Sequence, residues 1–253
     1  MSSIKAIILA AGQGSRLKNL TKEIPKCMVT IGKKKIIDYQ LDALIENNIR
    51  DVVIVVGYQK EKLISYIKNN KYSSLMNVLF LDNEIYKKTN SCYSLWVAQD
   101  HMKNGYIHLN SDLIFHPDLL RELLGQNSSG MIVDHVRKNE DDMVRGMINN
   151  NYITKINKTG NLDHPDCIIV GPIYFSKSDV SYLIDELNKE INNGDITNAC
   201  YLLFDKILDR INCTPVFSDG LFWKEVDTQD DINFIEKTYE IFFKTHNSAK
   251  AEL

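Results

Sequence analysis

The sequence predicts a doubly wound α/β fold, and two observations support this prediction. Short, almost wholly apolar runs alternate along the chain with stretches whose apolar residues recur at helical spacing. Residues 6–9, 51–56 and 78–81 are such runs and are typical of buried strands. Alternating strands and helices place parallel strands in one sheet with helices on both faces. We therefore expect a Rossmann-like mixed sheet that binds ligands at the carboxyl ends of its strands.

The remaining elements follow from the same two periodicities. Asn149 to Asn151 is predicted to be a turn, and Asp219-Gly220 is typical of a hairpin turn between the last two strands. Helices are expected at 37–49, 63–67, 90–102, 117–124, 183–191, 201–211 and 232–239, and further strands at 106–109, 132–136, 147–156, 168–175, 215–218 and 221–226.

The chain is predicted to form a single domain over residues 1–246. Its 253 residues are ample for one large core, and no repeat, low-complexity tract or linker divides them. The β-rich stretch at about 130–175 is expected to form a small lobe over the site, and residues 247–253 a C-terminal tail.

Composition narrows the class of protein. Hydrophobic residues make up 44% and charged residues 25%, as in soluble globular proteins, and the net charge of −3 gives no electrostatic basis for binding nucleic acid or anionic membranes. Five dispersed cysteines without a CxxC motif favour reduced thiols. We expect no signal peptide, because the N-terminal apolar run is too short for one and lacks its cleavage site, and no apolar run approaches the roughly 20 residues of a membrane span. We expect a cytoplasmic monomer or homodimer without nucleic-acid partners or membrane insertion.

The first strand runs into a glycine-containing loop that is suited to phosphate. Gly12 and Gly14 let the backbone approach a ligand with several N–H groups pointing one way, and Arg16 and Lys26 add cations. The loop lacks the Gly-Lys-Ser/Thr of a Walker motif and the third glycine of a dinucleotide fingerprint. The two glycines alone fit an ordinary tight turn equally well. With the two cations, the loop indicates a nucleotide site.

Two aspartates follow strand-like runs and are candidate metal ligands. Asp112 follows residues 106–109, and Asp227 ends the run WKEVD. Carboxylate oxygens suit Mg²⁺, a hard cation. Each aspartate also fits a helix cap or a turn, and Asp230 and Asp231 compete with Asp227 for that role.

The N-terminal motif closely resembles a family signature. Leu-Ala-Ala-Gly-x-Gly-Ser-Arg-Leu at 9–17, Leu-Thr at 20–21 and Ile-Pro-Lys-Cys-Met at 24–28 resemble the signature of the nucleoside-diphosphate-sugar pyrophosphorylase (nucleotidyltransferase) superfamily. The resemblance implies a GT-A-like fold in which Asp112 and Asp227 hold Mg²⁺ against the nucleotide α-phosphate. Ser111 stands where the superfamily commonly has glycine.

Later segments resemble a narrower branch, the phosphocholine cytidylyltransferase-like enzymes. They are Asn90 with Tyr-Ser-Leu-Trp at 93–96, LNSDLIFHPDLL at 109–120, Asp-Asp-Met at 141–143 and WKEVD at 223–227. The branch implies an enzyme of class EC 2.7.7 that joins CTP to a small phosphorylated alcohol such as phosphocholine, releases pyrophosphate, and supplies capsule or other cell-surface polysaccharide or lipid decoration. Related enzymes act on phosphoglutamine, inositol phosphate and aminoethylphosphonate.

Three alternatives to phosphocholine cytidylyl transfer remain open. The first is a phosphoglutamine or inositol-phosphate cytidylyltransferase. The second is a sugar-1-phosphate uridylyl- or thymidylyltransferase using UTP or dTTP, against which the segments after Asn90 and at KEVD speak. The third is a non-catalytic nucleotide-binding regulatory subunit, against which the retained Arg16, Lys26, Asp112 and Asp227 speak.

Specific residues are assigned to roles on this basis. An aromatic face with carboxylates would suit the ammonium head of an acceptor, although a strand tryptophan is usually core. His108, His116, Tyr93 and Trp96 are expected to be structural. The catalytic candidates are Arg16, Lys26, Asp112 and Asp227; the nucleotide-binding candidates are Leu9, Ala10, Ala11, Gly12, Gln13, Gly14, Ser15, Arg16, Lys26, Gly57, Tyr58, Asn90, Ser94 and Asp112; the acceptor-binding candidates are Asp141, Asp142, Tyr174, Trp223 and Glu225; and the metal ligands are Asp112 and Asp227.

Overall fold

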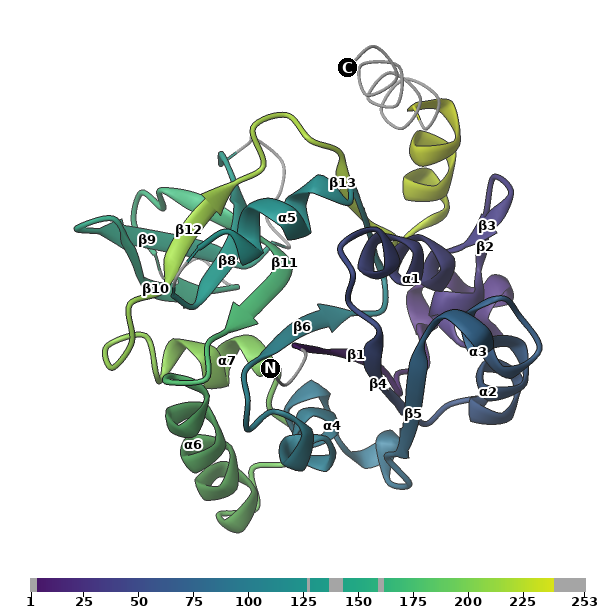
Figure 1. Cartoon of the computed structure of the whole chain (residues 1–253), viewed down its shortest axis with the longest axis horizontal. Coiled ribbons are helices and arrows are strands. Elements are labelled where there is room, and N and C mark those ends of the chain that lie inside the picture. The colour runs from purple at the N-terminus through teal and green to yellow at the C-terminus, as the bar shows by residue number, and fades with distance from the viewer. Residues whose placement is uncertain (1–3, 127, 137–142, 159–161, 239–253) are drawn as a thin grey trace.

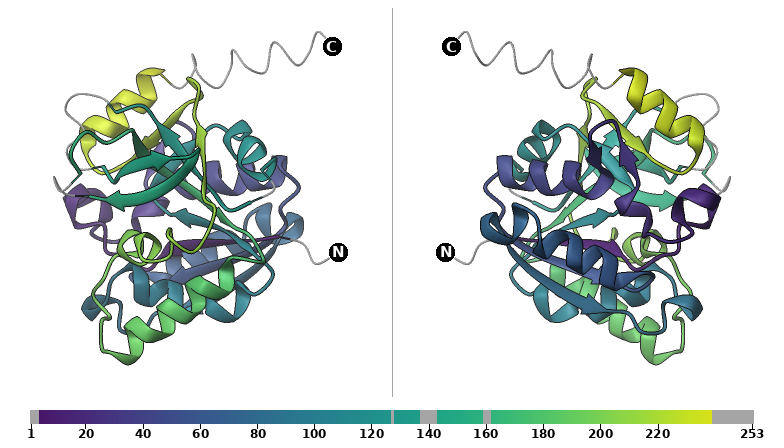
Figure 2. Two further views of the ribbon diagram at one scale, coloured as in Figure 1. Left: turned by 90° about the vertical axis from the view of Figure 1, so that its left-hand side faces the viewer. Right: turned by 90° about the vertical axis from the view of Figure 1, so that its right-hand side faces the viewer.

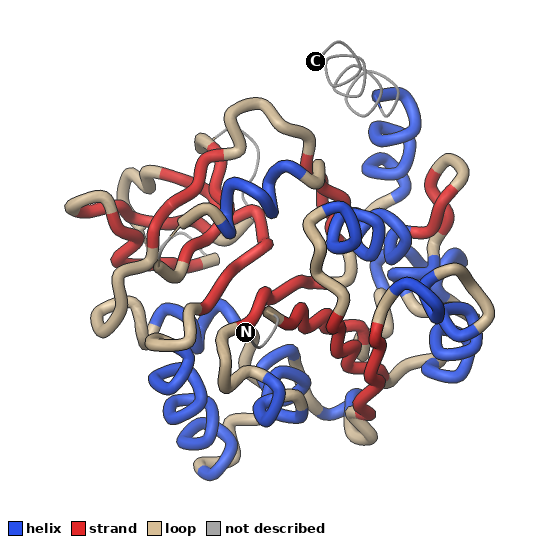
Figure 3. The backbone as a smooth tube through the Cα atoms, in the orientation of Figure 1, coloured by secondary structure: helices blue, strands red, loops and turns tan. Residues whose placement is uncertain are grey.

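The computed structural model describes residues 4–126, 128–136, 143–158 and 162–238, and within them a nine-stranded sheet runs through the molecule (Figures 1 and 3). Its strands are β1 (Lys5–Ala10), β4 (Asp51–Val56), β5 (Asn77–Asp82), β6 (Tyr106–Asn110), β8 (Gly130–Asp134), β9 (Arg145–Asn149), β10 (Tyr152–Asn157), β11 (Cys167–Phe175) and β12 (Thr214–Phe217). Their order is β10-β9-β11-β6-β1-β4-β5, and β8 pairs with both β11 and β12.

The sheet is parallel where the site forms. β1 lies between β4 and β6, parallel to both, and β4 pairs with β5 in the same direction. Side chains alternate between the two faces of β1: Ala6 and Ile8 join one buried cluster, and Ile7 and Leu9 join the other. A strand buried on both faces is an apolar run, as the sequence shows. The predicted mixed α/β sheet is confirmed.

Helices cover both faces of the parallel strands. α1, α2 and α3 contribute to the cluster on one face, and α4, α6 and α7 to the cluster on the other. The helices are α1 (Ile36–Glu46), α2 (Lys60–Lys68), α3 (Tyr72–Leu75), α4 (Ser91–Val97), α5 (Asp118–Leu124), α6 (Val180–Asn192) and α7 (Cys200–Asp205), with short 3₁₀ segments η1 (Ser15–Thr21), η2 (Lys26–Met28), η3 (Tyr86–Lys88) and η4 (Gln99–His101). A last helix covers residues 229–238. Across the described ranges, no helix has the length and apolar character that a membrane span requires.

The strands predicted at about 130–175 gather at one end of the molecule (left in Figure 1). They are β8, β9, β10 and β11, and β12 joins them from later in the chain. Asn150 and Asn151, at φ 49° and 66°, make the predicted turn between β9 and β10. β11 pairs with both β6 and β9, so these strands are hydrogen-bonded to the parallel part. The division into one domain with a lobe and a tail stays a prediction.

Several sequence-based boundaries were wrong. β12 and the short strand β13 (Trp223–Glu225) do not form a hairpin around Asp219-Gly220: β12 pairs with β8, and β13 with β7 (Leu113–Phe115). The helix predicted at 201–211 ends at Asp205 as α7, and the one at 90–102 is α4 followed by η4. The small pair β2 (Thr30–Ile31) and β3 (Lys34–Lys35) was not predicted.

A third apolar cluster joins the two ends of the described chain. Leu17 and Val29, from the N-terminal loop, pack in one cluster with Val226, which follows β13, and with Ile232 and Ile235 of the last helix. Figure 2 shows the C-terminal helix beside the N-terminal segments in both views. This packing holds Asp227 close to the N-terminal loop. All five cysteines are free and buried.

Candidate active site

The loop after β1 has the backbone shape that the sequence indicated. Gly14 lies at φ +61°, and a Cβ there would lie 2.8 Å from the Cβ of Lys26, so only glycine fits without strain. The Thr21 hydroxyl donates to the Gly14 carbonyl at 2.8 Å and braces the turn. At Gly12, by contrast, a Cβ would meet nothing within 4 Å, so this backbone faces open space that a ligand can enter.

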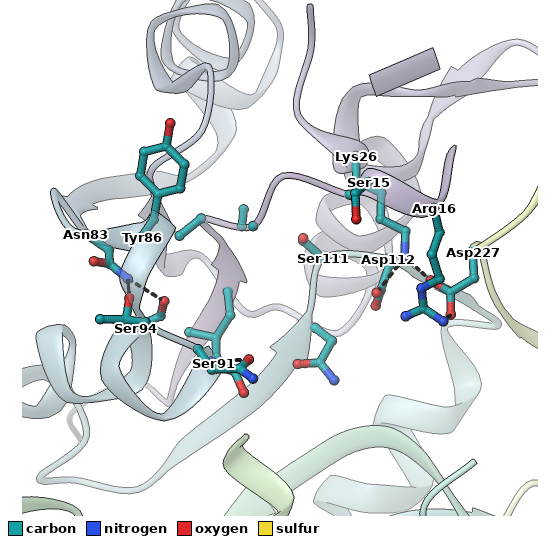
Figure 4. Close-up of a pocket in the computed structure, with 18 residues that line it drawn as sticks. Ser15, Arg16, Lys26, Asn83, Tyr86, Ser91, Ser94, Ser111, Asp112 and Asp227 are labelled. Atoms are coloured by element: carbon teal, nitrogen blue, oxygen red, sulfur yellow. Dashed lines mark hydrogen bonds and ion pairs between the residues drawn. The ribbon is translucent and has the colours of Figure 1, made fainter. Parts of the chain in front are cut away.

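The four predicted catalytic residues meet in one charged array (Figure 4). The Lys26 ammonium donates to Asp112 Oδ2 at 2.8 Å and also to Asp227 Oδ1, while Arg16 pairs with Asp227 Oδ2 at 2.8 Å. Asp112 follows β6 and Asp227 follows β13. The pairing of β13 with β7, with the Val226 N–H donating to the Asp112 carbonyl at 2.9 Å, brings the two carboxylates together.

Burial and charge compete over the ionisation of this array. Burial alone would lower the pKa of Lys26, but the carboxylates of Asp112 and Asp227 raise it above 10.5, so the lysine stays charged. Glu225 lies beside them. Burial, with the negative charges of Asp112 and Asp227, raises the pKa of Glu225 to about 8.

The residues present fit a divalent metal ion that takes further ligands from a bound molecule. Asp112 Oδ1 is buried and has no hydrogen-bond partner. A buried carboxylate oxygen of this kind can serve as a ligand of a divalent cation. Within the described ranges, no group of three or more histidine, cysteine, aspartate or glutamate side chains is placed to hold a metal by itself. Asp112 and Asp227 as Mg²⁺ ligands stay a prediction.

Two cavities meet at the charged array. The first, of about 340 Å³, is lined by Leu9, Ala10, Ala11, Gly12, Gly14, Ser15, Arg16, Lys26, Asn83, Tyr86, Thr89, Asn90, Ser91, Ser94, Asn110, Ser111, Asp112 and Asp227. The second, of about 290 Å³, extends past Glu225 and His108 toward β10, β11 and α7. They share Arg16, Asn90, Ser91, Asn110, Asp112 and Asp227. A molecule in each cavity would therefore meet the other at the charged array.

Most of the predicted nucleotide-binding residues line the first cavity. Gln13, Gly57 and Tyr58 do not. Gly57 lies behind the loop, where a Cβ would come within 2.9 Å of the Ala11 carbonyl oxygen. The Tyr58 N–H donates to that same oxygen at 3.0 Å. These two residues support the loop rather than line the cavity.

Sequence reasoning missed six residues of the first cavity. Asn83 is buried, and its Nδ2 donates to the hydroxyls of Thr89 and Ser94 at 3.0 Å each. Asn83 and Ser111 come immediately after β5 and β6, and this position is a signal that could have identified them, because ligands bind at these strand ends. The six are Asn83, Tyr86, Thr89, Ser91, Asn110 and Ser111.

The predicted acceptor-binding residues differ in whether they line a cavity. Glu225 lines the second cavity. Trp223 donates its Nε1–H to Asp134 Oδ2 at 2.8 Å and, like Tyr174, packs against the core on the α1 face; neither lines the two cavities formed by the described residues. Asp141 and Asp142 lie outside the described residues.

Of the four aromatic side chains expected to be structural, His108 alone lines one of the two cavities. Trp96 donates to Asn188, and its ring lies 5.4 Å from that of Tyr93. His116 Nδ1 accepts from the Asp118 N–H at 3.2 Å. His108 also lines the second cavity, where burial lowers its pKa to about 4 and keeps the imidazole neutral near pH 7.

The chain is similar to several known proteins. The nucleotidyl transferase family model matches residues 5–151. The CTP:phosphoglutamine cytidylyltransferase of Campylobacter jejuni is 32% identical over 262 residues, which cover 92% of this chain and all of that protein. The choline-phosphate cytidylyltransferase of Streptococcus pneumoniae is 36% identical over 125 residues, covering 49% of this chain and 52% of the relative.

Solved structures show the same fold. A structure of the CTP:phosphocholine cytidylyltransferase of Streptococcus pneumoniae superimposes with a TM-score of 0.78 at 24% identity, over 94% of this chain and 99% of the other. The inositol-1-phosphate CTP transferase of T. maritima does so with a TM-score of 0.79 at 20% identity, over 96% of each chain. At such identities the likeness establishes the fold.

Proposed function

The chain belongs to the nucleotidyl transferase family, and from that premise we propose that it is a cytidylyltransferase which joins CTP to a small phosphorylated acceptor and releases pyrophosphate. The observation that carries the proposal is the junction of the two cavities at Arg16, Asp112 and Asp227, whose two carboxylates Lys26 contacts. One cavity offers a glycine-containing loop for a triphosphate, and the other has room for an acceptor. The charged residues stand where the two would meet.

In this reaction the chain positions the two substrates and neutralises the negative charge of their phosphates. An oxygen of the acceptor phosphate attacks the α-phosphorus of CTP; the new P–O bond forms as the bond to the β-phosphate oxygen breaks, and pyrophosphate leaves. The acceptor phosphate is already ionised near neutral pH, so the step needs no general base. Arg16 and the loop at 12–14 would hold the leaving phosphates, and Lys26 would neutralise charge at the α-phosphate.

A divalent cation would add positive charge at the same place. The carboxylates of Asp112 and Asp227 would hold Mg²⁺, and the unpartnered Asp112 Oδ1 is an oxygen available as a ligand. When bound, the metal supplies positive charge against the phosphate oxygens. Lys26 bridges both carboxylates and would keep them in place before the metal arrives.

The choice of CTP is supported by relatives rather than by lining residues. Two relatives are named as cytidylyltransferases. The one matched over its full length acts on phosphoglutamine, and the one matched over about half of its length acts on choline phosphate. We propose that the CDP-linked product feeds a cell-surface polysaccharide or lipid.

A substrate matrix tests the proposal. Pyrophosphate release is measured for CTP, UTP, dTTP and ATP, each with phosphocholine, phosphoglutamine, inositol 1-phosphate, aminoethylphosphonate and glucose 1-phosphate. We expect turnover with CTP and one of the first four acceptors. Strong turnover of glucose 1-phosphate with UTP or dTTP would instead support the sugar-nucleotide alternative. Nucleotide binding without turnover in any pair would support a regulatory subunit.

A further inference from the structure

Tyr58 contacts the phosphate loop, residues 12–22, at both of its ends. It lies just beyond the carboxyl end of β4, and its backbone N–H donates to the carbonyl of Ala11 at 3.0 Å. Its side-chain hydroxyl donates to the carbonyl of Lys22. One residue from another part of the chain therefore holds the segment that enters the loop and the segment that leaves it.

The contact at Lys22 also supports the glycine turn. Thr21, the neighbour of Lys22, is buried, and its hydroxyl donates to the Gly14 carbonyl at 2.8 Å. Between these residues the 3₁₀ segment η1 is interrupted at Lys18, where φ is 46° and ψ is −109°. Because 3₁₀ hydrogen bonds have poor geometry and this segment is also interrupted, contacts from outside the loop are needed to keep its shape.

The hydroxyl of Tyr58 can be removed without changing its other contacts. Tyr58 is half-buried and does not line the first cavity formed by the described residues. Its ring lies edge-on to the ring of Tyr86, with centroids 6.3 Å apart, and Tyr86 does line that cavity. A phenylalanine at this position would keep the ring contact and the backbone hydrogen bond to Ala11, and would lose only the hydrogen bond to Lys22.

Resting on the proposed cytidylyl transfer, we propose that Tyr58 is a positioning residue for the triphosphate, because its hydroxyl holds the phosphate loop in the shape that receives the β- and γ-phosphates. A loop that is already ordered loses less conformational entropy when a ligand binds, so the ligand binds more tightly. Gly12 and Arg16, which this shape presents, line the first cavity. The effect falls on the phosphates that the loop holds and not on the rest of the nucleotide.

Tyr58→Phe tests the proposal through a comparison of CTP with CMP, which lacks the β- and γ-phosphates. The dissociation constants of both nucleotides are measured by isothermal titration of the full chain in the presence of Mg²⁺. We expect Tyr58→Phe to weaken CTP binding about threefold to tenfold, the usual loss for one hydrogen bond, and to change CMP binding by less than about twofold.

Tyr66→Phe is the matched control. Tyr66 lies on α2, and its hydroxyl donates to both carboxylate oxygens of Asp38, at 2.9 and 2.8 Å, in a contact that involves no residue of the loop. The control should leave the affinities for CTP and CMP unchanged, although it also removes a hydrogen-bonded hydroxyl.

Three results would overturn the role of Tyr58 and leave cytidylyl transfer standing. They are unchanged CTP binding in Tyr58→Phe, an equal loss for CTP and CMP in that variant, and the same loss for CTP alone in Tyr66→Phe. Failure of the wild-type protein to bind CTP would overturn the proposed function itself.

Discussion

The Nζ of Lys26 lies 2.8 Å from the Oδ2 of Asp112, across 86 residues of sequence. Both side chains are largely withdrawn from solvent, with exposed fractions of 12% and 27%. The same lysine also contacts Asp227, so removing it would leave Asp112 without this cation and Asp227 with Arg16 alone. The same contacts keep the lysine beside the aspartates that we propose as metal ligands.

Gly14→Ala tests the shape of the phosphate loop. The added Cβ would lie 2.8 Å from Lys26 Cβ at a backbone φ of +61°, so we expect a loss of unfolding free energy of about 1–3 kcal/mol and a raised KM for CTP. Gly194→Ala is the control, because φ there is +85° and nothing lies within 4 Å of the new Cβ. It should show the backbone cost alone and an unchanged KM. Equal KM values in the two variants would contradict the packing argument.

Asp112→Asn tests the metal site. The substitution keeps the shape of the side chain but removes the charge and weakens the buried Oδ1 as a ligand. We expect kcat to fall about 100-fold or more, and the Mg²⁺ concentration for half-maximal activity to rise at least about tenfold. Chelation of divalent ions should abolish wild-type activity. Asp209→Asn, at an exposed position, should match the wild type in all three respects. Full wild-type activity in the chelated protein would exclude the metal.

Trp223→Phe separates a structural role from the acceptor role that the sequence suggested. Its Nε1–H donates to the buried Asp134 at 2.8 Å, so loss of that hydrogen bond should cost about 1–2 kcal/mol of unfolding free energy. Because Trp223 lines neither described cavity, kcat and the acceptor KM should stay at wild-type values at a temperature where both proteins are folded. A raised acceptor KM with unchanged stability would restore the original assignment.

Residue type and strand ends made two aspartates candidates for the charged part of the site, and the resemblance to a family signature favoured that role over a helix cap or a turn. Asp112 and Asp227 were found in this way and do converge. The pairing that joins them was missed, since β7 and β13 have three residues each and such short strands leave no periodicity. Asn83 was missed because its role rests on two hydrogen bonds whose partners lie 6 and 11 residues away. Trp223 was misplaced because an aromatic residue near carboxylates fits a core contact equally well.

His108 should make stability depend on pH below neutrality. Burial lowers its pKa from 6.5 to about 4, and the side chain of Asn110 opposes this only in part. Between these values the unfolded chain binds the proton and the folded protein does not, so stability is fully present above pH 6.5 and falls as the pH decreases toward 4. We expect the drop in unfolding free energy from pH 7.5 to pH 5, measured by urea denaturation, to be smaller in His108→Leu. His164→Asn, at an exposed position, should keep the wild-type drop. An identical drop in His108→Leu would show that other groups govern the acid sensitivity.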